Sequence, residues 1–277
     1  MNAFGIISIA VGSTAAVLAA AGLICKPKTV YWDEPDERNP MEGKRVVFVP
    51  DEAEPKNADG VRGHLEEIGI QKIKTCFYEA FVKRLLDMLI SFVGLLLLSP
   101  VFLAVSLAIL IDDPGPVIFS QKRLGMGKRY FRMHKFRSMK LNAPHDIPTH
   151  MLSDPKRHMT RVGRFIRAAS LDELPQIWDI FIGNMSIVGP RPGLWNQDLL
   201  TAERDKYDAN DAKPGLTGWA QINGRDELDI PKKAELDGYY THILKSGGFK
   251  AFLFDIKCFA GSVLPVARRE GFREGNE

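Results

Sequence analysis

Cysteine is scarce in this sequence of 277 residues. Cys25, Cys76 and Cys258 lie far apart and form no C-x-x-C pair, which argues against a disulfide framework or a zinc site. Internal repeats and low-complexity tracts are also absent. No metal-ligand spacing is found among the histidines His134, His145, His150, His158 and His242. The chain is therefore neither a disulfide-stabilised scaffold nor a repeat protein.

Acidic residues are missing from two stretches, residues 114–145 and 155–171. Both stretches are basic, whereas residues 29–75 hold eleven acids against seven bases, so the net charge of only +3 hides an uneven distribution. A basic block beside an apolar segment favours anionic partners such as lipid head groups or phosphates. The alternative is a solvated basic surface. The first stretch carries Lys122, Arg123, Lys128, Arg129, Arg132, Lys135, Arg137 and Lys140.

Charge is absent from residues 2–25 as well. A helix of that length spans roughly 36 Å, which is enough for the hydrocarbon core of a bilayer. A cleaved signal peptide is the alternative, but no basic region precedes the segment, and Lys26 and Lys28 follow it. The sequence therefore predicts a retained transmembrane anchor over residues 1–28, with its carboxyl end in the cytoplasm.

A second apolar segment covers residues 85–111 and contains Ser99 and Pro100 near its middle. Proline removes an amide donor and clashes with the preceding turn, so we expect a break there. The Ser99 hydroxyl can bond to a carbonyl that the break frees. Basic residues flank both ends, and each arm is too short to cross a bilayer. The pattern predicts a re-entrant helix over residues 81–112; the alternative is a spanning helix with a tolerated kink.

The rest of the chain is expected to be α+β and mostly helical, with a small β hairpin around "GMGK" and surface amphipathic helices. Residues 29–80 read as a polar connector of unassigned role, with one strand in "RVVFVP" and a short helix or loop in "GVRGHLEEIGIQKI". Helices are predicted over residues 161–183, 196–208 and 249–259. The last of these suits either a core or a membrane surface.

Two adjacent acids in "SLDEL", Asp172 and Glu173, are the strongest chemical candidates. Ser170 and Glu173 also fit a helix capping box, but Pro175 disfavours that geometry at Leu174. The acids follow a cationic run, which keeps a carboxylate ionised. An ionised carboxylate can attack phosphorus, and a neighbouring carboxylate can hold Mg²⁺.

Three cations are candidate phosphate ligands. Lys135 and Arg137 in "HKFRSM" share one strand face, with a solvated strand edge as the alternative. Arg191 in "VGPRPG" lies between Pro190 and Pro192, which stiffen its backbone and suit bidentate phosphate recognition. The alternative for Arg191 is a salt bridge within a loop.

Four ordered motifs together resemble the bacterial sugar transferases, the monotopic polyprenol-phosphate phosphoglycosyl transferases. The resemblance covers residues 83–266, about two-thirds of the chain. The smallest members of that family begin near the re-entrant helix, whereas this chain has some 80 residues before it. These residues are too few to form the extra domain of the largest members. The motifs are "LLLLSPVFLAVSLAILIDDPGPVIFSQKRLG", "MHKFRSM", "TRVGRFIRAASLDELPQIWDIFIGNMSIVGPRPG" and "KPGLTGWAQINGR".

This resemblance implies that sugar-1-phosphate passes from a UDP-sugar to undecaprenyl phosphate with release of UMP. Asp172 would be the nucleophile that carries the phosphosugar, and Glu173 the magnesium-binding acid. The Ser99-Pro100 break would make the membrane helix re-entrant, which places a catalytic domain over residues 113–266 on the cytoplasmic face of the inner membrane. The resemblance assigns phosphate contacts to Lys135, Arg137 and Arg167, and nucleotide proximity to Pro190, Arg191 and Pro192.

Inner-membrane lipids and downstream glycosyltransferases are the further partners that this reading implies. Residues 267–277 are expected to form a charged C-terminal tail. Two other mechanisms or roles stay open. The lipid phosphate could attack directly, with Asp172 as a base or metal ligand, or the chain could be a non-catalytic membrane adaptor that binds nucleotide or a partner protein. Nucleic-acid binding is disfavoured because no base-reading motif is present.

Overall fold

The computed structural model describes residues 38–144, 155–224 and 227–268. The predicted anchor over residues 1–28 lies outside these ranges, as does the predicted tail from residue 269 onward. The strands are β1 (Lys44–Pro50), β2 (Gly63–Ile70), β3 (Ile118–Leu124), β4 (Tyr130–Phe136), β5 (Ser186–Val188) and β6 (Gly215–Thr217). The helices are α2 (Arg84–Leu97), α3 (Ser99–Asp112), α4 (Pro155–His158), α5 (Arg161–Ala168), α6 (Gln176–Ile182), α7 (Asp198–Asp205), α8 (Trp219–Ile222), α9 (Ile230–Ser246) and α10 (Gly248–Arg268).

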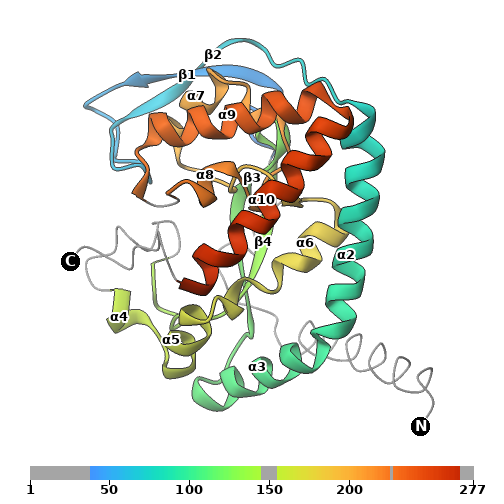
Figure 1. Ribbon diagram of the computed structural model, residues 1–277. Coiled ribbons are helices and arrows are strands. Elements are labelled where there is room, and N and C mark those ends of the chain that lie inside the picture. Colours follow the sequence, from blue (N-terminus) through green and yellow to red (C-terminus); the bar gives the residue numbers. More distant parts are fainter. Residues whose placement is uncertain (1–37, 145–154, 225–226, 269–277) are drawn as a thin grey trace.

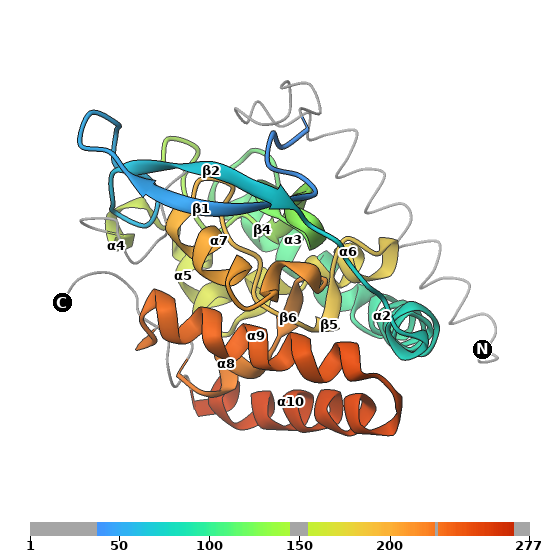
Figure 2. The ribbon, with the colours of Figure 1, turned by 90° about the horizontal axis from the view of Figure 1, so that it is seen from above.

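The described residues form a mixed architecture of helices and small sheets, as predicted, but only about half of them are helical rather than most. The described residues form three two-stranded sheets, of which β1-β2 and β3-β4 are antiparallel and β5-β6 is parallel. The predicted hairpin around "GMGK" is β3-β4, which runs through the middle of the fold (Figure 1). The predicted helix over residues 249–259 lies within α10, which packs beside α9 (Figure 2).

The apolar segment forms two helices that meet at an angle, as the proline predicted. Tyr78–Leu97 and Ser99–Asp112 are bent by 59° relative to each other and follow the edge of the molecule (Figure 1). The Ser99 hydroxyl donates to the Leu96 carbonyl oxygen at 2.8 Å, which satisfies an acceptor at the break. Among the described residues no single helix is long and apolar enough to span a membrane, whereas this bent pair meets the length and composition criteria together.

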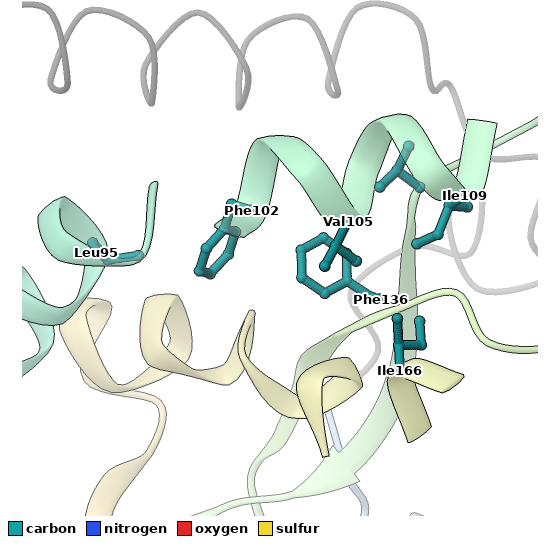
Figure 3. Packing of buried hydrophobic residues seen from close by; sticks show 7 residues of the cluster. Leu95, Phe102, Val105, Ile109, Phe136 and Ile166 are labelled. Carbon is teal, nitrogen blue, oxygen red and sulfur yellow. The ribbon is translucent and has the colours of Figure 1, made fainter. Parts of the chain in front are cut away.

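One face of the bent pair is buried against the rest of the fold. Leu95 of α2 and Phe102, Val105 and Ile109 of α3 form a core that includes Phe136 of β4 and Ile166 of α5 (Figure 3). The opposite face of the pair is exposed and apolar: its large exposed side chains are Leu85, Met88, Leu89, Ile90, Phe92, Val93, Leu97, Leu103, Leu107 and Ile111. Burial of one face fixes the pair to the domain, and most of the other face is exposed.

The N-terminal hairpin, residues 38–71, departs from the predicted connector. β1 is the expected strand in "RVVFVP", but Gly63–Ile70 is a second strand rather than a helix or loop. Local sequence alone did not show that this segment would pair with β1 from Lys44 to Pro50. The hairpin lies across α7 (Figure 2), so it belongs to the folded domain.

Candidate active site

The acid pair lies on a short turn between two helices. The sequence predicted one helical segment over residues 161–183, but α5 ends at Ala168 and α6 begins at Gln176. Ser170 between them has φ +54°, a left-handed conformation that is uncommon for a residue with a side chain. Ser170 makes no side-chain cap hydrogen bond, so the capping-box alternative is not formed. The interruption sets Asp172 and Glu173 on a tight 3₁₀ turn, Leu171–Glu173.

Glu173 is held by cations from two other parts of the chain. Its Oε1 accepts a hydrogen bond from Lys135 Nζ at 2.9 Å and another from Arg191 Nη2 at 2.6 Å. Lys135 lies on β4, and Arg191 lies in the loop after β5. These two predicted phosphate ligands and one predicted acid therefore meet, although they lie up to 56 residues apart, from 135 to 191. Both contacts are ion pairs with little exposed side-chain surface on Glu173.

Asp172 is buried, with 6% of its surface exposed. Burial raises the pKa of its carboxyl group above the ordinary value, and the neighbouring Glu173 charge raises it further. The charges of Lys135, Arg167 and Arg191 act in the opposite direction and favour the carboxylate. A desolvated carboxylate facing several cations is a more reactive group than one in water, provided that it is ionised.

Burial also changes the cations of the site. It lowers the pKa of Lys135, an effect that the Glu173 carboxylate opposes. Burial and the nearby Arg191 charge lower the pKa of Arg123 to about 9, which leaves its guanidinium charged at neutral pH. From the sequence, Arg123 was expected only as one of several cations in a basic stretch. In the β3-β4 hairpin Phe119 pairs with Lys135, and Arg123 lies four residues after Phe119, on the same face of the sheet. Strand alternation across the predicted hairpin could therefore have identified Arg123 as a neighbour of Lys135.

The loop that carries Arg191 is fixed through its backbone. The carbonyl oxygens of Pro190, Arg191 and Pro192 accept hydrogen bonds at 2.8–3.0 Å from the Gly215 amide, Arg204 Nη2 and Arg123 Nη1, respectively. Gly189 allows the close approach behind the loop, because an added Cβ would lie 2.3 Å from the Lys213 carbonyl oxygen. Arg191 therefore extends from a rigid loop, as its flanking prolines predicted.

Arg137 is placed differently from Lys135. Its Nη1 donates to Asp113 Oδ2 at 2.6 Å, and its Nη2 donates to the Asp113 carbonyl oxygen. Asp113 is the C-cap residue of α3, and the neighbouring Asp112 accepts the Val162 amide at 2.8 Å at the start of α5. Arg137 thus fastens the end of the bent pair to the domain, and its predicted phosphate contact stays a prediction.

The donor chemistry of the acid pair fits Mg²⁺. Asp172 and Glu173 supply hard carboxylate oxygens, and Mg²⁺ in proteins typically uses one or two carboxylates together with phosphate oxygens and water. Glu173 Oε1 is shared by Lys135 and Arg191. These cations would have to share Glu173 with a bound ion.

The sequence pattern of the bacterial sugar transferase family matches residues 78–269. A UDP-glucose:undecaprenyl-phosphate glucose-1-phosphate transferase of Escherichia coli (strain K12) is 43% identical over 56% of this chain and 34% of its own length. A UDP-N-acetylgalactosamine-undecaprenyl-phosphate N-acetylgalactosaminephosphotransferase of Aeromonas hydrophila is 36% identical over 64% of this chain and 43% of its own length. The sugar transferase EpsL of Bacillus subtilis (strain 168) is 35% identical over 70% of this chain and 92% of its own length.

The chain spans about a third of the length, 31–34%, of the Escherichia coli transferase and of two undecaprenyl-phosphate glucose transferases from Xanthomonas campestris and Komagataeibacter xylinus. The family match nevertheless covers the bent pair, the β3-β4 hairpin, the turn with the acid pair and the Arg191 loop. With the family pattern over most of the chain and a relative matched over nearly its whole length, this protein belongs to the bacterial sugar transferase family.

Proposed function

We propose that this protein is a phosphoglycosyl transferase that moves sugar-1-phosphate from a UDP-sugar to undecaprenyl phosphate, with release of UMP. The observation that carries this proposal is the placement of the acid pair. Asp172 is buried among cations, and the adjacent Glu173 is bound by Lys135 and Arg191. Relatives that share this region are named as transferases of glucose-1-phosphate and of N-acetylgalactosamine phosphate to undecaprenyl phosphate.

The proposed reaction has two displacements at one phosphorus atom. A carboxylate oxygen of Asp172 bonds to the phosphorus that bears the sugar, and the bond from that phosphorus to UMP breaks. An oxygen of undecaprenyl phosphate then bonds to the same phosphorus, and the aspartyl bond breaks. Each step exchanges one phosphorus–oxygen bond for another, so no oxidant or reductant is needed. Splitting the transfer in this way is the ordinary use of a carboxylate nucleophile.

The cations have a separate part in this proposal. Arg191, Lys135 and Arg167 surround the acid pair with positive charge, which favours an ionised Asp172 and attracts a diphosphate. Mg²⁺ held by Glu173 would neutralise charge that develops on the diphosphate. Arg191 is well suited to an oxyanion because its guanidinium presents fixed donors from a loop with a fastened backbone.

We place the protein on the inner membrane, with the bent pair re-entrant and the acid pair on the cytoplasmic face. The apolar outer face of α2 and α3 has the composition of a lipid-facing surface. Exposed apolar residues on α10, Phe249, Leu253, Ile256 and Phe259, fit a helix that lies at the interface. This location would bring a soluble sugar nucleotide and a lipid phosphate to one site.

A panel of UDP-sugars with undecaprenyl phosphate and Mg²⁺ tests the proposal through UMP release. We expect one donor, or a small group of donors, to give release that depends on the lipid phosphate. A phosphosugar trapped on Asp172 separates covalent transfer from direct attack by the lipid. No release from any donor, together with undiminished function of Asp172→Asn in cells, would favour the non-catalytic adaptor instead.

A further inference from the structure

The N-terminal hairpin contacts the loop that bears Arg191, although the family match begins only at residue 78. We propose that this hairpin is a positioning element for that loop, with Asp59 as the positioning residue. The inference rests on the proposed function for its effect on catalysis. The effect of the hairpin on the structure of the loop can be measured without any activity.

A buried network of charges fixes the hairpin to the catalytic fold. Lys128, with no exposed surface, donates from Nζ to Asp205 at 3.0 Å and to Gln71 Oε1 at 2.6 Å. Arg45 on β1 donates to Asp211 at 2.9 Å, and the Val46 amide donates to Asp205 at 2.9 Å. Breaking such a buried network is costly, so the hairpin is held in one position.

Asp59, in the connection between β1 and β2, reaches the start of α7. Its Oδ2 accepts the Leu200 amide at 3.1 Å, and its Oδ1 accepts Gln197 Nε2 at 3.1 Å. The amide of the adjacent Ala58 donates to the Asn196 carbonyl oxygen at 3.0 Å. Gln197, at the N-cap position of α7, makes no side-chain cap bond of its own, so Asp59 supplies an acceptor to this helix from a distant part of the chain.

Two routes lead from Asp59 to the backbone around Arg191. In the first, the oriented Gln197 accepts the Leu194 amide through Oε1 at 2.8 Å, and the adjacent Gly193 carbonyl accepts the Leu124 amide at 3.0 Å. In the second, α7 carries Arg204, which donates to the Arg191 carbonyl oxygen at 2.8 Å. Both routes end on the loop whose arginine holds Glu173.

Burial supports a structural reason for an acid at this position. It raises the pKa of Asp59, while hydrogen bonds from the Leu200 amide and Gln197 favour its carboxylate. A carboxylate is costly to bury, so it is expected where its hydrogen bonds hold the structure better than those of a neutral side chain would. Here the two carboxylate oxygens serve two donors at once.

The test compares Asp59→Ala and Asp59→Asn in the full chain with Glu54→Gln, which neutralises an exposed acid in the same hairpin. Hydrogen exchange is followed in peptides that cover residues 189–197. We expect Asp59→Ala to speed exchange there about tenfold, the size of a typical lost helix cap, and Glu54→Gln to leave it unchanged. Asp59→Asn keeps one carbonyl acceptor and should fall between these variants. It also serves as the test should Asp59→Ala fail to fold.

A double-mutant cycle separates positioning from general stability. We expect Asp59→Ala to lower kcat/KM about tenfold in the wild-type background but less than about twofold in an Arg191→Ala background, because it acts through Arg191. Equal losses in both backgrounds, or unchanged exchange in residues 189–197, would overturn the inference. If the wild type releases no UMP with any donor, the proposed function fails, and the exchange result alone decides whether the hairpin positions the loop.

Discussion

The start of the bent pair is fastened to α9 and α10 through one carboxylate, that of Asp255. Asp255 on α10 accepts hydrogen bonds from Tyr78 and from Lys83 Nζ, both at 2.7 Å, and from Tyr240 of α9 at 2.8 Å. Lys83 and Asp255 are both buried, so their ion pair is little screened by water. We predict that Asp255→Asn strongly destabilises the fold.

The magnitude follows from the charge that is left behind. Removing one partner of a buried ion pair typically costs about 3–5 kcal/mol, because the other charge stays buried without compensation. At about 2–4 °C per kcal/mol for a domain of this size, the melting temperature should fall by about 10 °C. Adding Lys83→Met removes the stranded charge, so the double variant should recover about half of the loss.

Thermal unfolding in detergent micelles is the assay. The control is the exposed pair Lys232 and Glu235, which are 2.8 Å apart with about half of each side chain exposed, 52% and 53%. Neutralising either member of this pair should change stability by less than about 1 kcal/mol. If Asp255→Asn melts within about 1 °C of the wild type, or if Lys83→Met adds to its loss, the argument from buried charge is refuted.

The remaining predictions concern the acid pair and its supports. Asp172→Asn should abolish covalent labelling and transfer. It should also raise the melting temperature at pH 7, because burial raises the pKa of Asp172. The contribution of a carboxyl group with a raised pKa to stability is full below the unfolded pKa and is lost as the pH rises through the folded pKa. For the same reason, the acidic limb of the kcat/KM profile should lie above the ordinary range of an aspartate, as measured by UMP release. Arg191→Lys should lower kcat/KM by about ten- to a hundredfold, because a lysine lacks the fixed fork of donors; wild-type rates would exclude that role. Gly163→Ala should cost about 1–3 kcal/mol in thermal unfolding, because its Cβ would lie 1.9 Å from the Ser138 carbonyl oxygen, whereas Gly69→Ala, with open space at that position, should be nearly neutral.

Local patterns predicted the elements near the site well. Pro100 and Ser99 correctly predicted the bend in the apolar segment, because a break in the helical hydrogen-bond pattern is a local property of the backbone. "GMGK" between two alternating stretches gave the β3-β4 hairpin for the same reason. The helix predicted over residues 161–183 was wrong at Ser170, where the tertiary structure holds a left-handed residue against local preference.

Long-range contacts were harder to predict. Gly63–Ile70 pairs with β1 and lies on α7, and its own residues carry no clear strand pattern. Arg137 was predicted to share a strand face with Lys135, but β4 ends at Phe136, and Arg137 pairs with Asp113 at the end of α3. Neither partner follows from sequence spacing, since side chains 24 residues apart meet only through the path of the chain.

The sequence by itself determined the chemical groups, the bent apolar segment and the family, since these depend on residue types in a local order. The tertiary structure alone decided which cations surround Glu173, that Arg123 joins them, and that Asp59 from the N-terminal hairpin reaches α7. The physical reason is that hydrogen bonds and charge interactions act over a few ångströms in space, whatever the separation along the chain.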